Sequence, residues 1–138
     1  MRKILNCLSY LTLVTSFGLL ILIGYWLNYP YKPIEFKSMK ILTPIVKQGG
    51  ILKYDVDYCK YMALSAEVTR TFNNGIIYAT PTTISNNPTG CHVVTIFVII
   101  PPELPATKYT ITMRYEYQVN PLRKVEYKVT SDVFQIIQ

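Results

Sequence analysis

The residues of this 138-residue chain best suited to chemistry are three cysteines and a single histidine, namely Cys7, Cys59, Cys91 and His92. Any Ser-His-Asp or Cys-His scheme would have to use His92, and no nucleophile-elbow glycine pattern accompanies it. A metal site would have to combine Cys59, Cys91 and His92 without the C-x-x-C spacing typical of zinc sites. We therefore expect no catalytic residue and no metal ligand, with a small hydrolase that uses His92 as an alternative.

Two acidic residues, Asp55 and Asp57, share one face of a predicted strand, which could indicate paired carboxylates or a Ca²⁺ site. No Asp-rich loop or third ligand is nearby in the sequence, so a solvated strand face is the simpler interpretation. No glycine-rich phosphate-binding loop is present, and Gly49-Gly50 is interpreted as a turn. We expect neither a cofactor nor a small-molecule substrate.

The charge of the chain is basic, with 14 Lys and Arg against 8 Asp and Glu and a formal net charge of +6. Arg2 and Lys3 stand directly before a long apolar run, and the remaining residues carry a net charge of +4. No basic helix gathers that charge, so the composition argues against nucleic acid as a partner.

The apolar run from Ile4 to Tyr31 contains no charged residue. Ile4–Leu27 provides 24 residues, and about 20 suffice for a helix to cross a hydrocarbon core. Pro30 and Pro33 then end any helix. The run therefore predicts a transmembrane helix. Its end carries aromatic residues of the kind that settle at the level of lipid headgroups, which are Tyr25, Trp26, Tyr29 and Tyr31.

A cleaved signal peptide is the competing interpretation of this run, because Arg2 and Lys3 form a basic n-region. Cleavage requires small residues just before the cut, yet the chain has no Ala before Ala63. The small residues Ser16 and Gly18 are followed by the most apolar part of the run. We therefore favour an uncleaved signal-anchor.

Beyond residue 33 the sequence alternates between apolar and polar residues, the pattern of half-buried β-strands. The longest example runs from Tyr109 to Val119. Val93–Ile100 is apolar at nearly every residue, so we expect a central strand buried on most sides. Asn74-Gly75 predicts a two-residue hairpin turn. The other strand candidates are Ile34–Ile41, Leu52–Tyr58, Ala66–Phe72, Ile76–Thr80 and Val125–Val129.

The stretch Glu103-Leu104-Pro105-Ala106-Thr107-Lys108-Tyr109 opens the longest alternating strand. It resembles the tyrosine corner of immunoglobulin-like (Ig-like) and fibronectin type III domains, in which a Tyr hydroxyl bonds back to the backbone upstream. The resemblance covers roughly Pro33 to Ile137. It implies an all-β antiparallel sandwich of about seven strands, with Tyr109 as the first residue of strand F and Leu104 and Pro105 in the corner.

The same resemblance implies that strands B and E are antiparallel neighbours, which places Cys59 at the end of one beside Cys91 at the start of the other. A disulfide between them would close a 33-residue loop and stabilise the fold by about 3.7 kcal/mol in the chain-entropy model. Such a bond belongs in an oxidising compartment. We therefore expect a protein of the cell membrane with its N-terminus in the cytoplasm and its domain outside, in the periplasm or the extracellular space.

These expectations divide the chain into a short cytoplasmic tail (1–3), a transmembrane signal-anchor helix (4–29), a linker (30–33) and an Ig-like β-sandwich domain (34–138). The expected strand order puts several loops at the pole that faces the membrane. Basic residues there could contact anionic headgroups, each worth up to about 1 kcal/mol, with scattered solubilising charge as the alternative interpretation. These residues are Lys32, Lys60, Arg123 and Lys124.

The sequence as a whole favours a single-pass membrane protein that presents an extracytoplasmic Ig-like sandwich as a non-catalytic binding or structural module. Its expected partners are the lipid bilayer and an unidentified protein. The alternative is a secreted or particle-associated structural or decoration protein of a phage or virus, with its N-terminal segment cleaved or embedded. A composition rich in Ile, Lys, Asn and Tyr and poor in Ala suggests AT-rich coding, which fits such a source.

Overall fold

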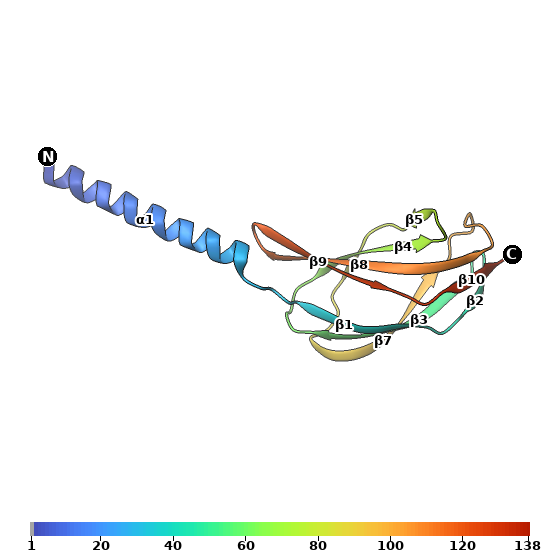
Figure 1. Cartoon of the computed structure of the whole chain (residues 1–138). Coiled ribbons are helices and arrows are strands. Elements are labelled where there is room, and N and C mark those ends of the chain that lie inside the picture. Colours follow the sequence, from blue (N-terminus) through green and yellow to red (C-terminus); the bar gives the residue numbers. More distant parts are fainter. Residues whose placement is uncertain (1) are drawn as a thin grey trace.

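The computed structural model describes residues 2–138, with side chains described from Tyr10 onward, so Met1 of the expected tail lies outside the described residues. Within this range one helix is followed by ten strands (Figure 1). The helix is α1 (Arg2–Asn28). The strands are β1 (Ile34–Ile41), β2 (Ile45–Lys47), β3 (Ile51–Lys60), β4 (Ala66–Asn73), β5 (Ile77–Ala79), β6 (Thr83–Ser85), β7 (Gly90–Ile99), β8 (Lys108–Asn120), β9 (Arg123–Thr130) and β10 (Phe134–Ile137).

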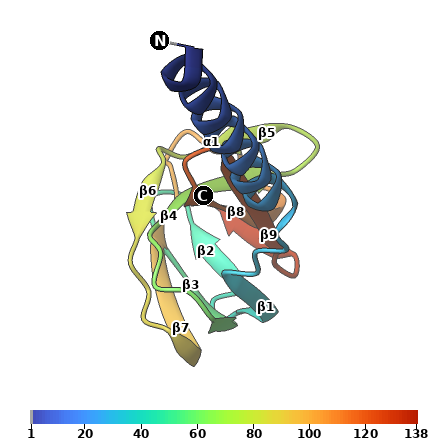
Figure 2. The same ribbon diagram turned by 90° about the vertical axis from the view of Figure 1, so that its left-hand side faces the viewer.

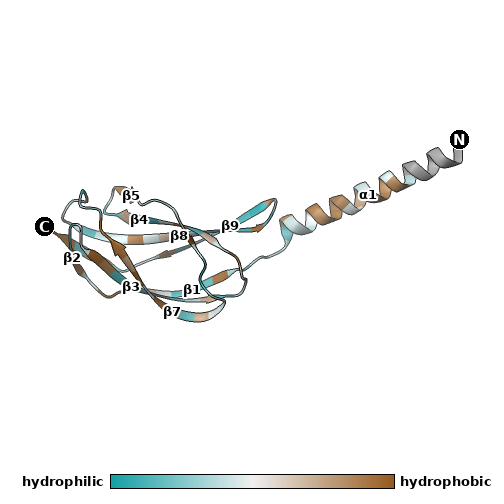
Figure 3. Ribbon diagram, turned by 180° about the vertical axis from the view of Figure 1, so that it is seen from behind, coloured by the Kyte–Doolittle hydropathy of each residue, from teal (hydrophilic) through white to brown (hydrophobic). Residues whose placement is uncertain are grey.

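Helix α1 extends away from the strands as a separate rod (Figure 1), and many of its described residues are hydrophobic (Figure 3). It begins at Arg2, two residues before the predicted start, and ends at Asn28. Its described side chains lie outside the core of the sandwich, and Tyr10–Asn28 is long and apolar enough to cross a membrane. At 1.5 Å per residue these 19 residues cover about 28 Å. The prediction of a long apolar N-terminal helix is confirmed.

The strands form two sheets that face each other as a sandwich (Figure 2). In the described part of the chain the smaller sheet has the order β1-β3-β7, and all its pairs are antiparallel. The larger sheet has the order β2-β10-β8-β4-β5, while β6 also pairs with β4 and β9 also pairs with β8. The short strand β2 pairs with β10 in parallel. The predicted β-rich sandwich is confirmed, but the expected number of about seven strands is wrong.

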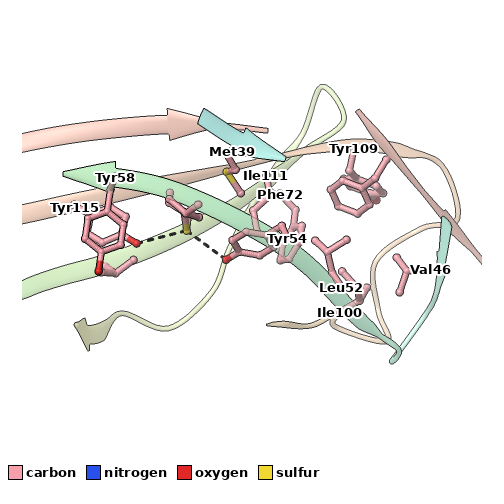
Figure 4. Packing of buried hydrophobic residues seen from close by; sticks show 14 of the residues in the cluster. Met39, Val46, Leu52, Tyr54, Tyr58, Phe72, Ile100, Tyr109, Ile111 and Tyr115 are labelled. Carbon is pink, nitrogen blue, oxygen red and sulfur yellow. Dashed lines mark hydrogen bonds between the residues drawn. The ribbon is translucent and has the colours of Figure 1, made fainter. Parts of the chain in front are cut away.

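The core lies between the sheets and is built from the alternating residues of β3 and β8. Leu52 and Tyr54 of β3 and Ile111 and Met113 of β8 are fully buried in this core. The hydroxyls of Tyr54 and Tyr115 both donate to the Met113 sulfur, at 3.3 and 3.9 Å (Figure 4). Period two in the sequence thus places large aromatic side chains in the interior and gives their hydroxyls a soft acceptor there.

The prediction for Val93–Ile100 is wrong in its burial. The segment forms most of β7, which is an edge strand of the smaller sheet. Its side chains alternate between partly buried and exposed positions, and Val93, Phe97 and Ile99 are 66%, 62% and 69% exposed. An apolar run without alternation predicts two apolar faces, and the structure covers only one of them.

The connection between β4 and β5 also differs in detail from the prediction. Asn73 pairs with Ile77, so three residues form the turn in place of two. Gly75 has a φ of 104°, the left-handed region that favours glycine, whereas Asn74 has a negative φ. The Asn74 side chain accepts a hydrogen bond from the Ile76 amide, which closes the turn locally.

Candidate functional site

Three side-chain hydrogen bonds join the end of α1 to the turn between β8 and β9. Asn120 Nδ2 donates to the carbonyl oxygen of Trp26 at 2.8 Å. Arg123 Nη1 donates to the carbonyl oxygens of Leu27 and Tyr29, at 2.8 and 2.9 Å. The last carbonyls of a helix have no partner within the helix, and they form the negative end of its dipole. A guanidinium and an amide at this position therefore cap the helix from a segment more than 90 residues away.

The segment after the helix is fixed by further contacts. Tyr127 of β9 donates its hydroxyl to the carbonyl oxygen of Tyr31 at 3.1 Å. The rings of Tyr25, Tyr29 and Tyr31 pack in series, with centroid distances of 5.1 and 4.8 Å. Three of the four predicted interface aromatics thus form one cluster, and the fourth, Trp26, presents its carbonyl to the hairpin. The expected linker (30–33) is anchored to the sandwich.

The four basic residues predicted to contact headgroups all have protein partners. Lys32 forms an ion pair with Glu35 at 2.9 Å, and this hydrogen bond raises the pKa of the lysine. Lys124 pairs with Glu116 and Glu67 across neighbouring strands. Arg123 is engaged by the helix carbonyls described above.

Lys60 differs from the other three basic residues because it is only 4% exposed. Its Nζ donates to the carbonyl oxygen of Asn87 at 2.6 Å, and burial lowers its pKa. Lys60 is the last residue of β3, and the loop before β7 covers it. In this conformation it is not accessible to a lipid surface, contrary to the expectation.

The two cysteines of the domain lie directly opposite each other in the antiparallel pair of β3 and β7. The Sγ atoms of Cys59 and Cys91 are 2.05 Å apart, the distance of a disulfide bond. The thiol of Cys7 belongs to the side chains that are not described. The bond links the middle and outer strands of the smaller sheet at the pole nearest the helix.

The residues considered for catalysis or metal binding have structural contacts. His92 Nε2 lies 2.9 Å from the carbonyl oxygen of Thr89, within the turn that leads into β7. Asp55 accepts a hydrogen bond from the Thr95 hydroxyl at 2.7 Å, on the outer face of the same sheet. Among the described residues no three His, Cys, Asp or Glu side chains gather closely enough to hold a metal ion.

The predicted corner residues lie at the pole away from the helix. The Tyr109 hydroxyl donates to the carbonyl oxygen of Pro105 at 3.0 Å and accepts from Asn74 Nδ2 at 3.1 Å. Leu104 is buried, and its carbonyl oxygen accepts from Gln48 Nε2. These bonds join three connections of the fold at one end of β8.

Sequence reasoning did not identify Asn120 and Arg123 as caps of the helix. Asn120-Pro121 reads as a turn, and Arg123 reads as a basic loop residue near the membrane. The only signal for a contact was the expected strand order, which puts this turn at the same pole of the domain as the end of the helix. No protein-family model matches the chain, and no curated protein matches it.

Proposed function

We propose that this chain is a single-pass membrane protein that presents an Ig-like β-sandwich outside the cytoplasm as a non-catalytic binding or structural module. The observation that carries the proposal is the exposure of α1. Large apolar side chains such as Leu13, Phe17 and Leu20 lie on the outside of a helix that does not fold back onto the sandwich. Such a surface is unfavourable in water and matches a lipid environment.

The strand order supports the Ig-like part of the proposal. Strands β1, β3 and β7 stand in the places of strands A, B and E, and β4, β8 and β9 in those of C, F and G. The hydrogen bond from Tyr109 to the carbonyl of Pro105 is the contact expected of a tyrosine corner. In this assignment the pair Cys59–Cys91 joins strands B and E.

The cysteines and the basic N-terminus support the proposed compartment. A disulfide between neighbouring strands persists in an oxidising compartment and is rare in the cytoplasm. Arg2 and Lys3 are the first residues of α1 and directly precede its uncharged run, and basic residues beside a span favour the cytoplasmic side. Both features support a sandwich outside the cytoplasm.

Extraction and mass measurement test the anchor directly. Membranes from cells that express the chain are washed with alkaline carbonate, and the intact mass of the retained chain is measured. We expect the chain in the pellet with its N-terminal segment present. Release into the supernatant, or loss of about 24 residues, would favour a secreted or particle-associated protein instead.

Thiol labelling tests the orientation. The denatured chain is treated with a large maleimide before and after reduction, and the adducts are counted on a gel. We expect one label per chain before reduction, on Cys7, and three afterwards. Three labels without reduction would show that Cys59 and Cys91 are free thiols and would argue for a cytoplasmic domain.

A further inference from the structure

Strand β7 has the composition of a strand that is covered on both sides, yet it is an edge strand. Its ten residues include no Asp, Glu, Lys or Arg. Natural proteins protect sheet edges with charges, prolines or bulges, because an open edge offers unpaired backbone N–H and C=O groups. β7 pairs with β3 over its full length, and within residues 2–138 no strand pairs with its other edge. The edge is therefore open and unprotected.

Both faces of β7 are mostly apolar at this open edge, although Thr95 is on the outer face and Lys53 Nζ of β3 lies 5.5 Å from the centroid of the Phe97 ring. Phe97 and Ile99 lie on the outer face, and Ile51 of β3 is exposed beside Ile99. On the inner face Val94, Ile96 and Val98 pack against the core but are only partly buried. A strand added next to β7 would cover apolar side chains on both faces, as well as the backbone groups.

A groove follows the same edge between β7 and the segment that leads into β6. It has a volume of about 660 Å³, and its walls include Phe97, Ile99, Pro81 and Pro101. The guanidinium of Arg70 is fixed at this groove by two bonds, from Nε to Tyr54 Oη at 3.2 Å and from Nη1 to Thr83 Oγ1 at 3.0 Å. No carboxylate of the described side chains lies within ion-pair distance of Arg70.

A second copy in the same membrane does not fit this edge. β7 runs from the pole near the helix toward the pole away from it, so antiparallel pairing of two copies would point their helices in opposite directions (Figures 1 and 2). Parallel pairing about a two-fold axis would bring the N–H groups of identical residues face to face, which no ladder uses.

We propose that β7 binds an extended apolar strand of a partner protein by β-addition, with a carboxylate of that strand paired to Arg70. The added strand continues the smaller sheet and lies in the groove beside Phe97 and Ile99. The apolar edge requires apolar side chains of the partner on both faces, and the fixed, unpaired guanidinium selects an acidic residue or a chain terminus. This inference rests on the proposed function, because it names the class of partner for the module.

A display library of random peptides of about ten residues, each with a free C-terminal carboxylate, tests the proposal. The library is selected against the purified chain in lipid nanodiscs. We expect enriched peptides that are apolar at most positions, and a weaker affinity when their carboxylate is replaced by an amide. The double variant Phe97→Lys, Ile99→Lys should bind them about tenfold more weakly, because charge on an edge opposes strand addition.

Two further variants serve as controls. Val133→Lys places one lysine on an exposed apolar residue of the connection between β9 and β10, away from β7, and should leave peptide binding unchanged. Arg70→Gln should remove the difference between the acid and amide forms of one peptide. Thermal unfolding of each variant shows whether it is folded, and the acid–amide comparison on the unaltered chain needs no variant.

The outcomes separate this proposal from the one on which it rests. No enrichment, enrichment of polar peptides, or equal binding by the double lysine variant would overturn strand addition at β7. A dimer in nanodiscs that the same variant abolishes would show that a second copy occupies the edge, and would also overturn it. The carbonate test can fail while peptide binding holds, since binding is measured on the purified chain.

Discussion

Strands β7 and β8 are both long and rich in apolar residues, but they occupy opposite situations in the fold. β8 lies inside the larger sheet, with β4 on one side and β9 and β10 on the other. Its thirteen residues alternate, so one face fills the core and the other carries Thr, Arg, Glu and Gln side chains. The ten residues of β7 do not alternate between apolar and polar types. One edge and the outer apolar face of this strand are uncovered.

The difference shows what each pattern reports. Alternation predicts which face of a strand is buried, and for β8 this prediction is confirmed. A continuous apolar run predicts a strand that is buried on both faces. The elements that bury it are not necessarily in the same chain. Substitutions and changes of pH should therefore affect the interior strand more strongly than the edge strand.

The largest effect is expected at alkaline pH, because the buried tyrosines of β8 have no equivalent in β7. Burial raises the pKa of Tyr115 to about 12, and it raises the pKa of Tyr117 as well. The folded state favours the neutral phenol, whereas the unfolded chain ionises near pH 10. The contribution of Tyr115 to the free energy of unfolding is therefore fully present below pH 10 and is lost as the pH rises from 10 to 12. Tyr115 alone accounts for about 3 kcal/mol.

Chemical unfolding of the chain in detergent, followed by near-ultraviolet circular dichroism between pH 8 and 12, measures this loss. Tyr115→Phe should have a shallower decline above pH 10. An identical pH dependence in the two proteins would contradict the assignment to Tyr115.

The next largest difference is expected when an isoleucine of each strand is replaced by alanine and the free energies of unfolding are compared. Ile111 of β8 is fully buried, and Ile111→Ala should lower the free energy of unfolding by about 3 kcal/mol through lost burial and a residual cavity. Ile99→Ala makes the same change on β7, where the side chain is 69% exposed, and should cost less than about 0.5 kcal/mol. Urea unfolding of both variants checks the pair, and similar losses would mean that the edge of β7 is covered in solution.

A smaller contrast concerns two buried tyrosine hydroxyls, one on β8 and one on β3. Tyr109→Phe removes the bonds to Pro105 and Asn74 and should destabilise the domain by about 1 kcal/mol. The hydroxyl of Tyr58 has no hydrogen-bond partner among the described residues. Tyr58→Phe should therefore be neutral or slightly stabilising, as thermal unfolding can show. A loss at both positions would indicate that Tyr58 has a partner in solution.

The smallest effect is expected on the surface of β1. The hydrogen bonds that Glu35 accepts from Lys32 and Tyr61 lower the pKa of its carboxyl. Their stabilisation is present above the ordinary pKa of Glu and is lost as the pH falls through the lowered value. The groups are exposed and screened, so Glu35→Gln should flatten the acid limb of stability only slightly. A thermal unfolding series between pH 3 and 6 measures this, and a steeper acid limb in the variant would contradict it.

Local periodicity was enough to predict the helix and the interior strands. An uncharged run of helical length and an eleven-residue alternation each carry many residues that agree, so α1 and β8 were found with nearly correct ends. The strands that were missed or misjudged lack such a signal. β2 and β6 are three residues long, too short to show a period.

The positions that sequence reasoning misplaced depend on contacts between distant segments. Whether β7 is central or at the edge depends on the order of strands in the sheet, which no local pattern encodes. Lys60 and Arg123 are basic residues in loops by sequence, and their partners, Asn87 and the end of the helix, lie 27 or more residues away. The Cys59–Cys91 pair could be anticipated because a resemblance supplied the strand order.

The hydrogen bonds at the end of α1 couple the orientation of the sandwich to the orientation of the helix. In a bilayer thinner than its apolar length, a spanning helix tilts. Since Asn120 and Arg123 bind the helix carbonyls and Tyr127 holds the following segment, a tilt of α1 turns the sandwich with it. If the chain spans a membrane and binds a partner at β7 as proposed, the direction in which β7 faces depends on the thickness of that membrane, and lipid composition affects partner recognition.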